Sequence, residues 1–172
     1  MTMIRTLLLA VAPLVLALTA APAHAQQVDG LGQFKNWTAY RTQQGGKNLC
    51  YMASTPTKDE GKYTQRGKIY AMVSHRPATK ALNVVSVHTG YTYKEDSRVT
   101  IAIGGAKWQL FVHGDTAWAS SAADDVALVK AMRAGATMVI KGTSSRGTAT
   151  TDTYSLAGFT AAHNTIGKAC GL

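Results

Sequence analysis

Three histidines are the residues of this chain best suited to acid–base or metal chemistry. His75, His88 and His113 lie in or at the end of stretches with the alternation of β-strands. Imidazole transfers protons near neutral pH and is a common zinc or copper ligand. However, no His-x-His, His-Glu-x-x-His or Cys-x-x-Cys pattern is present. We therefore interpret these histidines as structural or surface residues and predict no metal site.

Other catalytic arrangements are supported even less well. Ser144, His113 and Asp152 form a Ser–His–Asp set on paper, but the Gly-x-Ser-x-Gly elbow that would support it is absent. Two of the nine acidic residues, Asp124 and Asp125, are adjacent at a predicted helix start, which does not suit a paired-carboxylate glycosidase. The sequence predicts a non-enzymatic protein without catalytic residues or cofactors. The alternative is a periplasmic hydrolase or metal-binding protein that uses one of the three strand histidines.

A stretch of small polar residues around Arg146 is the first candidate binding segment. Ser144 and Ser145 precede this arginine in the predicted turn of a hairpin. A guanidinium held at a hairpin tip can bind a carboxylate or phosphate through two parallel hydrogen bonds. We predict these three residues as binding residues, against the plainer interpretation of an exposed turn with a solubilising arginine.

A polar connection with aromatic residues is the second candidate segment. Tyr91, Tyr93 and Lys94 lie within four residues of one another. Aromatic rings beside a cation suit a sugar, a peptide or a protein surface. These residues are predicted to bind a partner, with packing in the core as the alternative.

The charge of the chain indicates what kind of partner it meets. The sequence has 18 Lys and Arg against 9 Asp and Glu, a formal net charge of +9, and no block of like charges. Such a surface suits anionic lipid head groups, cell-envelope polymers or a protein surface of a host. Nucleic acid, the usual partner of basic chains, is not expected outside the cytoplasm. Positive charge that serves only solubility is the alternative.

The first residues have the layout of a secretory signal peptide. Arg5 is followed by an apolar run over residues 7–18 and by Ala23-His24-Ala25. The run is too short to cross a hydrocarbon core of ~30 Å as a helix, and no later stretch is long enough. We predict a signal peptide over residues 1–25, one domain over residues 26–172 and no transmembrane segment in the mature chain. The expected location is periplasmic, with secretion or peripheral association with the outer membrane left open.

Two cysteines remain after removal of such a leader. An oxidising compartment would pair Cys50 with Cys170. Redox-active thiols are typically close in sequence, and these two are not. We therefore expect a structural disulfide.

The elements that position these residues are mostly strands. Alternating stretches separated by turn residues predict strands over residues 34–41, 48–54, 68–76, 82–89, 98–103, 107–113, 116–119, 137–143 and 148–156. Helical spacing predicts helices over residues 123–134 and 158–169. Residues 56–67 form a polar, mobile connection in this interpretation. The predicted fold class is mainly β, an antiparallel sheet or β-sandwich of about eight or nine strands with two peripheral α-helices.

Several motifs of the chain resemble those of a known family. They are Trp37-Thr38-Ala39-Tyr40, Cys50 to Ser54, Gly114 to Ala119 and, most specific of all, Lys141 to Phe159. With them, about residues 33–170 resemble the invasion-associated locus B family of α-proteobacterial secreted proteins. The resemblance implies a periplasmic or outer-membrane-associated protein, linked in pathogenic relatives to host-cell invasion. It also implies a disulfide between the two cysteines, and it implies no catalytic activity.

Overall fold

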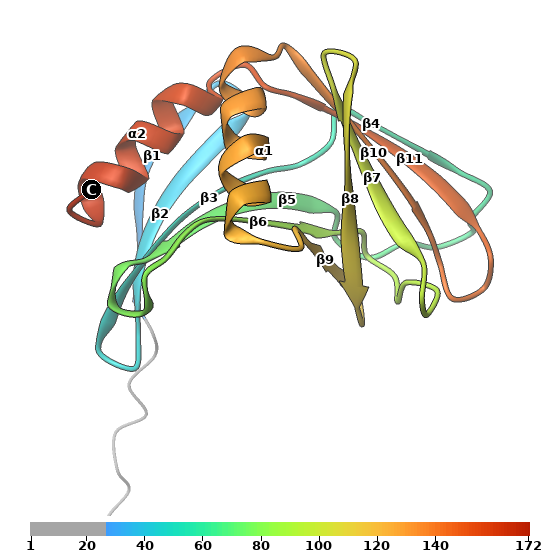
Figure 1. Ribbon diagram of the computed structural model, residues 1–172, viewed down its shortest axis with the longest axis horizontal. Coiled ribbons are helices and arrows are strands. Elements are labelled where there is room, and N and C mark those ends of the chain that lie inside the picture. Colours follow the sequence, from blue (N-terminus) through green and yellow to red (C-terminus); the bar gives the residue numbers. More distant parts are fainter. Residues whose placement is uncertain (1–26) are drawn as a thin grey trace, which may run out of the picture.

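A computed structural model describes residues 27–172, in which eleven antiparallel strands form one sheet and two helices pack on one of its faces (Figure 1). The predicted signal peptide, residues 1–25, lies outside the described residues. The fold-class prediction is confirmed: the chain is mainly β with two peripheral helices. No helix within residues 27–172 is long and apolar enough to span a membrane.

The elements follow one another as a long β-rich part, a helix, a hairpin and a second helix. The strands are β1 (Val28–Phe34), β2 (Trp37–Gln44), β3 (Lys47–Ser54), β4 (Lys58–Gly61), β5 (Tyr70–Arg76), β6 (Ala81–His88), β7 (Arg98–Ile103), β8 (Ala106–His113), β9 (Thr116–Trp118), β10 (Thr137–Thr143) and β11 (Ala149–Ser155). The helices are α1 (Ala122–Ala134) and α2 (Phe159–Ala169), with a 3₁₀ turn, η1 (Pro77–Thr79). The strand order in the sheet is β1-β2-β3-β5-β6-β9-β8-β7-β10-β11-β4.

The inner face of the sheet carries the core because apolar residues alternate along the strands. Val99, Ile101 and Ile103 of β7 are buried, as are Met138 and Ile140 of the neighbouring β10. The tight turn at residues 104–105 that joins β7 to β8 needs two glycines, because both positions have positive φ. The predicted hairpin is therefore present.

The sheet is strongly curved (Figure 1), and the start of β2 lies close to the end of β11. The indole Nε1 of Trp37 on β2 donates a hydrogen bond of 3.0 Å to the carbonyl of Ser155 on β11. After β3, only three residues separate Ser54 from Lys58, at the start of the edge strand β4 beside β11. Of the two predicted alternatives, an antiparallel sheet or a β-sandwich, the structure has the first, as one curved sheet.

Two strands were not predicted, and both are at the edges of the sheet. Three of the seven residues of β1 are apolar but none of the seven is fully buried, and all four residues of β4 are exposed. Backbone pairing with β2 and β11 defines these strands, so no buried apolar face marks them in the sequence. The prediction that all of residues 56–67 form a mobile connection is wrong, since this segment contains β4.

The helices begin and end close to the predicted positions. Ser121 caps α1, because its hydroxyl accepts the backbone N–H of Asp124 at 3.1 Å. The buried Asp125 accepts the backbone N–H of Val85 on β6 at 2.9 Å, which ties this helix to the sheet. At the end of α2, Cys170 forms the predicted disulfide with Cys50 of β3. The bridge therefore holds the last helix on the inner face.

Candidate functional site

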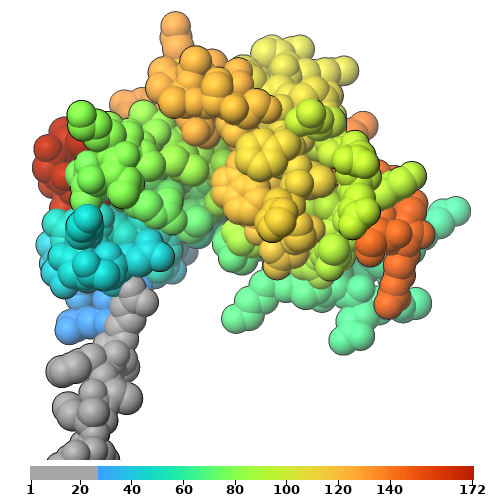
Figure 2. Space-filling view, turned by 60° about the horizontal axis from the view of Figure 1, so that its bottom comes forward, coloured from blue at the N-terminus to red at the C-terminus, as the bar shows by residue number. Residues whose placement is uncertain are grey.

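A cleft of about 560 Å³ opens where three separate segments meet near the edge of the sheet. The segments are residues 62–67 between β4 and β5, residues 90–92 after β6, and residues 144–150 at the β10–β11 hairpin. In the space-filling view, the hairpin (orange-red) and the segment around residue 60 (green-blue) project next to each other at one end of the molecule (Figure 2). A volume of this size is typical of ligand sites.

Arg66 lies at the floor of the cleft, where it forms a buried ion pair with Asp152 beneath the lining. Both terminal nitrogens of Arg66 donate to the two carboxylate oxygens of Asp152, each at 2.6 Å, and Nε donates to the carbonyl of Thr89 at 2.6 Å. The two side chains are only 3% and 1% exposed. Burial acts to lower the pKa of Arg66, but hydrogen bonds to Asp152 and its charge outweigh that effect and raise the pKa. The guanidinium therefore carries a positive charge, which the carboxylate of Asp152 compensates. Its three hydrogen bonds fix its position.

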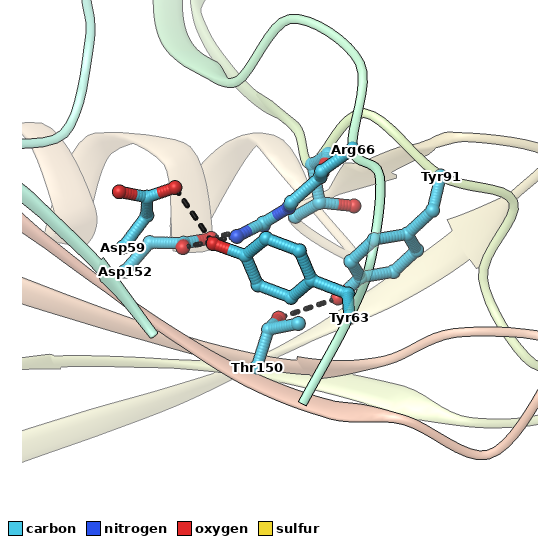
Figure 3. A network of polar contacts seen from close by, with 7 residues as sticks. Asp59, Tyr63, Arg66, Tyr91, Thr150 and Asp152 are labelled. Carbon is cyan, nitrogen blue, oxygen red and sulfur yellow. Dashed lines mark hydrogen bonds and ion pairs between the residues drawn. The ribbon is translucent and has the colours of Figure 1, made fainter. Parts of the chain in front are cut away.

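Two tyrosines lie against this guanidinium (Figure 3). The ring centres of Tyr63 and Tyr91 are 5.4 and 5.1 Å from its central carbon, a cation–π geometry. Tyr63 donates to Asp59 at 2.7 Å, and the hydroxyls of Tyr91 and Thr150 lie 2.7 Å apart in a hydrogen bond. Each ring is thus held at both its face and its hydroxyl.

Backbone pairing fixes the second and third segments to each other. The N–H of Ser145 donates to the carbonyl of Thr92 at 2.8 Å, and Tyr93 forms an isolated antiparallel bridge with Ser144. Gly142 is required beside this pairing, because an added Cβ would lie 2.9 Å from both Tyr91 Oη and Tyr93 Cε1. These contacts hold the two segments together in the wall of the cleft.

The charge of the cleft is positive. Lys62, Arg66 and Arg146 are among its lining residues, and none of the lining residues is acidic. Arg66 is neutralised by Asp152, whereas within residues 27–172 no carboxylate forms an ion pair with Lys62 or Arg146. Both of these cations are exposed. They supply uncompensated positive charge at the rim.

The structure brings four of the six predicted binding residues together. Arg146, Ser144, Ser145 and Tyr91 line the cleft, although the sequence placed them in two unrelated stretches. The other two, Tyr93 and Lys94, do not line it. Tyr93 is 2% exposed and packs edge-on against Tyr91, while Lys94 is exposed.

Sequence reasoning missed the residues at the floor and on the opposite wall. Lys62, Tyr63 and Arg66 belong to a segment interpreted as a polar connection. Asp152 was one signal available in the sequence, because it lies between Thr150 and Tyr154 on the same buried face of β11. A carboxylate on a buried strand face needs a cationic partner, and that need points to an arginine from elsewhere in the chain.

The three strand histidines are not brought to one site. His75 pairs with Cys50 near one end of β5, whereas His88 pairs with Tyr70 at the other end. His113 is exposed at the end of β8. Among the described residues, no group of three or more His, Cys, Asp or Glu side chains could hold a metal ion.

The Ser–His–Asp set is not arranged for catalysis either. The hydroxyl of Ser144 accepts the backbone N–H of Thr148 at 3.1 Å. Both carboxylate oxygens of Asp152 bind Arg66, so neither is oriented by or toward a histidine. His113 forms a strand pair with Thr116 and not with either of the other two residues.

A second polar cluster lies at the opposite end of β5, beside the disulfide. His75 Nδ1 accepts the backbone N–H of Asn83 at 3.0 Å, and His163 of α2 donates from Nε2 to the Asn83 side-chain oxygen at 2.8 Å, since Arg133 donates to its Nδ1 at 3.0 Å. Burial, together with the neighbouring His75 and Arg133, lowers the pKa of His163 to about 4. Burial also lowers the pKa of His75. Both rings are neutral near pH 7.

Comparisons with known proteins agree on the kind of chain this is. The model of the Invasion associated locus B (IalB) protein family matches residues 37–167. The crystal structure of invasion associated protein b from Bartonella henselae has a similar fold, with a TM-score of 0.55 and 19% sequence identity over 78% of this chain and 92% of that chain. No curated protein matches the sequence.

Proposed function

Since the chain belongs to the invasion associated locus B family, we propose that it is a non-enzymatic binding or adhesion protein of the cell envelope that holds an anionic partner in the cleft around Arg146. The partner is a component of the envelope or of a host surface. The protein acts outside the cytoplasm, in the periplasm or at the outer membrane. The name of the Bartonella neighbour, invasion associated protein b, favours a role in contact with a host.

One observation carries this proposal: three segments far apart in the sequence converge on a preformed cleft whose two rim cations have no acidic partner within residues 27–172. Exposed cations that are not used within the fold attract anions from solution and raise their rate of encounter. The hydrogen bonds within the wall and floor add a second argument, because a site that is already ordered loses little conformational entropy on binding.

The disulfide and the charge support the proposed location. A bridge such as Cys50–Cys170 forms and persists in oxidising compartments. A formal net charge of +9 suits anionic head groups and polymers of the envelope. The hydrolase or metal-binding alternative has no comparable support, because His75 lies at the far end of β5 from His88.

A pull-down from solubilised envelope tests the proposal without a guess about the ligand. Residues 26–172 are immobilised as the wild type, as Arg146→Ala and as Lys107→Ala, which removes a charge from another hairpin. We expect Arg146→Ala to retain less envelope material while its unfolding free energy changes by less than about 0.5 kcal/mol, since the side chain is exposed. Equal retention by wild type and Arg146→Ala would contradict the assignment of the cleft.

Elemental analysis of the purified protein tests the alternative. A stoichiometric metal would support the metal-binding hypothesis and would direct attention to the histidines.

Pull-downs from lysates of a host cell, run in parallel with those from envelope fractions, separate a role in host contact from one in envelope maintenance.

A further inference from the structure

The residues that line the cleft indicate the chemical class of its ligand, provided that the proposed function is right. We infer that the cleft binds an acidic saccharide, with an anionic group of the sugar at Arg146 and Lys62 and a sugar ring against Tyr91 in its wall. Three features of the lining lead to this ligand class, and each excludes a different competitor.

The first feature is the pair of uncompensated cations. Lys62 and Arg146 come from opposite segments, 62–67 and 144–150, and both are exposed at the same cleft. Among residues 27–172, no acidic side chain lines the cleft to repel an anion. A neutral saccharide would leave both charges unused, so the ligand carries at least one carboxylate, phosphate or sulfate group.

The second feature is the set of hydroxyl groups around these cations. Thr64, Thr92, Ser145 and Thr148 line the cleft, and the first three are exposed. Hydroxyls donate and accept hydrogen bonds, which matches a ligand that itself carries many hydroxyls. The acyl chains of a lipid would need an apolar lining instead, and this cleft does not provide one.

The third feature is an aromatic ring held in place by contacts at its face and its hydroxyl. Tyr91 is half-buried, its hydroxyl is bonded to Thr150 and its ring lies 5.1 Å from the guanidinium carbon of Arg66. The C–H groups of a pyranose ring pack on such aromatic faces, whereas an isolated inorganic anion gains nothing from them. Arg66 is in this sense a positioning residue: its pair with Asp152 holds the ring in the wall of the cleft.

The cleft is also larger than an isolated anion needs. Its volume of about 560 Å³ is within the range of sites for small organic ligands. The backbone hydrogen bond from Gly67 to Gly90, 2.9 Å, joins the first two segments where they line the cleft.

Calorimetric titration of residues 26–172 tests this inference. The probes are short oligosaccharides of galacturonate, hyaluronate and heparin, each paired with its methyl-esterified form, which for heparin is also desulfated and N-acetylated, together with inorganic phosphate and phosphatidylglycerol vesicles. We expect at least one acidic oligosaccharide to bind about tenfold more tightly than its neutralised form, a difference that one charged hydrogen bond supplies.

Variants then locate the binding. Arg146→Ala and Lys62→Ala should each weaken the acidic oligosaccharide by about tenfold, while Lys107→Ala and Lys130→Ala, which remove exposed charges elsewhere, should not. Tyr91→Leu should lose more affinity than Tyr91→Phe, because only the latter keeps the ring. A saccharide that binds all variants alike overturns the inference.

The outcomes separate the ligand class from the proposed function. If phosphatidylglycerol vesicles or phosphate bind in an Arg146-dependent way and no acidic oligosaccharide does, the saccharide inference is wrong and the anion-binding function stands. If no acidic oligosaccharide is preferred over its neutralised form, the inference is likewise overturned. If Arg146→Ala also retains envelope material as the wild type does, the proposed function fails together with it.

Discussion

The two ends of β5 are closed in different ways. At the disulfide end, defined by Cys50, Cys170, His75, His163 and Asn83, a covalent bond and two neutral imidazoles fill the space between the sheet and α2. At the cleft end, a charged arginine is inserted from a loop and is neutralised by a carboxylate of β11.

The difference shows how one fold can separate stability from recognition. At the disulfide end the buried and half-buried groups are two neutral imidazoles and a covalent bond that cannot exchange with a ligand, and the nearby cations Arg133 and Lys168 are exposed. The cleft end places its charges at a solvent-accessible surface, where the inner pair is satisfied and the rim cations are not. We infer that the first end mainly stabilises the chain and that the second end mainly binds.

The largest effect on stability is expected at the disulfide end. The double variant Cys50→Ala/Cys170→Ala removes a cross-link that spans 120 residues. On the chain-entropy model, a loop of that length is worth roughly 4 to 5 kcal/mol. Urea unfolding should show a loss of this order. Saccharide or envelope binding below the melting temperature should persist, and a simultaneous loss of binding would break the proposed division between the two ends.

The next largest effect is expected at the floor of the cleft. Asp152→Asn leaves Arg66 buried without a charged partner, and breaking such a pair costs about 3 kcal/mol or more. The matched control is Asp59→Asn, because Asp59 is exposed and only accepts from Tyr63. Chemical unfolding of both variants measures how much unfolding free energy each one loses. A similar small loss in the two would mean that the buried pair contributes no more than a surface hydrogen bond.

The strand alternation explains why the fold could be predicted from the sequence. Val99, Ile101 and Ile103 reach one buried face because successive strand residues point to opposite sides. The edge strands β1 and β4 were missed because they are defined by backbone pairing with a neighbouring strand. Such pairing leaves no local pattern in the sequence. The prediction of β4 would have required knowledge that β11 has a free edge beside Lys58 to Gly61.

The cleft was only partly predictable for a related reason. Arg146 and Tyr91 could be selected individually from their polar surroundings, but their proximity depends on the bridge between Tyr93 and Ser144. That pairing joins residues about 50 positions apart and follows from the order of the strands. Arg66 has the local sequence of a surface residue, and its burial is decided by Asp152 on a distant strand.

The disulfide end should also respond to pH. The unfolded chain takes up a proton on His163 near its ordinary pKa of 6.5, whereas the folded chain does so only near 4. Stability is therefore fully present above about pH 6.5 and decreases as the pH falls toward 4. The groups around His163 are His75, Arg133 and Lys168, which are cationic or become so in acid.

His163→Gln tests this dependence, because the amide can still donate to Asn83 but does not titrate. The difference in unfolding free energy between wild type and variant should shrink as the pH falls from 7 to 4. We expect the change to be smaller than the loss in Asp152→Asn, since the His163 ring is only half-buried. His113→Gln, at an exposed position, is the control. If the unfolding free energies of all three proteins change with pH in parallel, titration of His163 does not contribute to the stability of this end.

The smallest effect should come from the hydroxyl of Tyr91 at the cleft end. Tyr91→Phe removes the hydrogen bond to Thr150 and keeps the ring beside Arg66. A partly buried neutral hydrogen bond is worth about 1 kcal/mol, so the unfolding free energy should fall by that amount. Thr150→Val and the double variant complete a cycle, in which a coupling energy of about 1 kcal/mol assigns the loss to this pair. If the coupling energy is near zero, the contacts with Arg66 and Tyr93 hold the ring without help from Thr150. The cleft wall would then depend on the same buried charge as its floor, and recognition at this end would be less separable from stability than the comparison with the disulfide end implies.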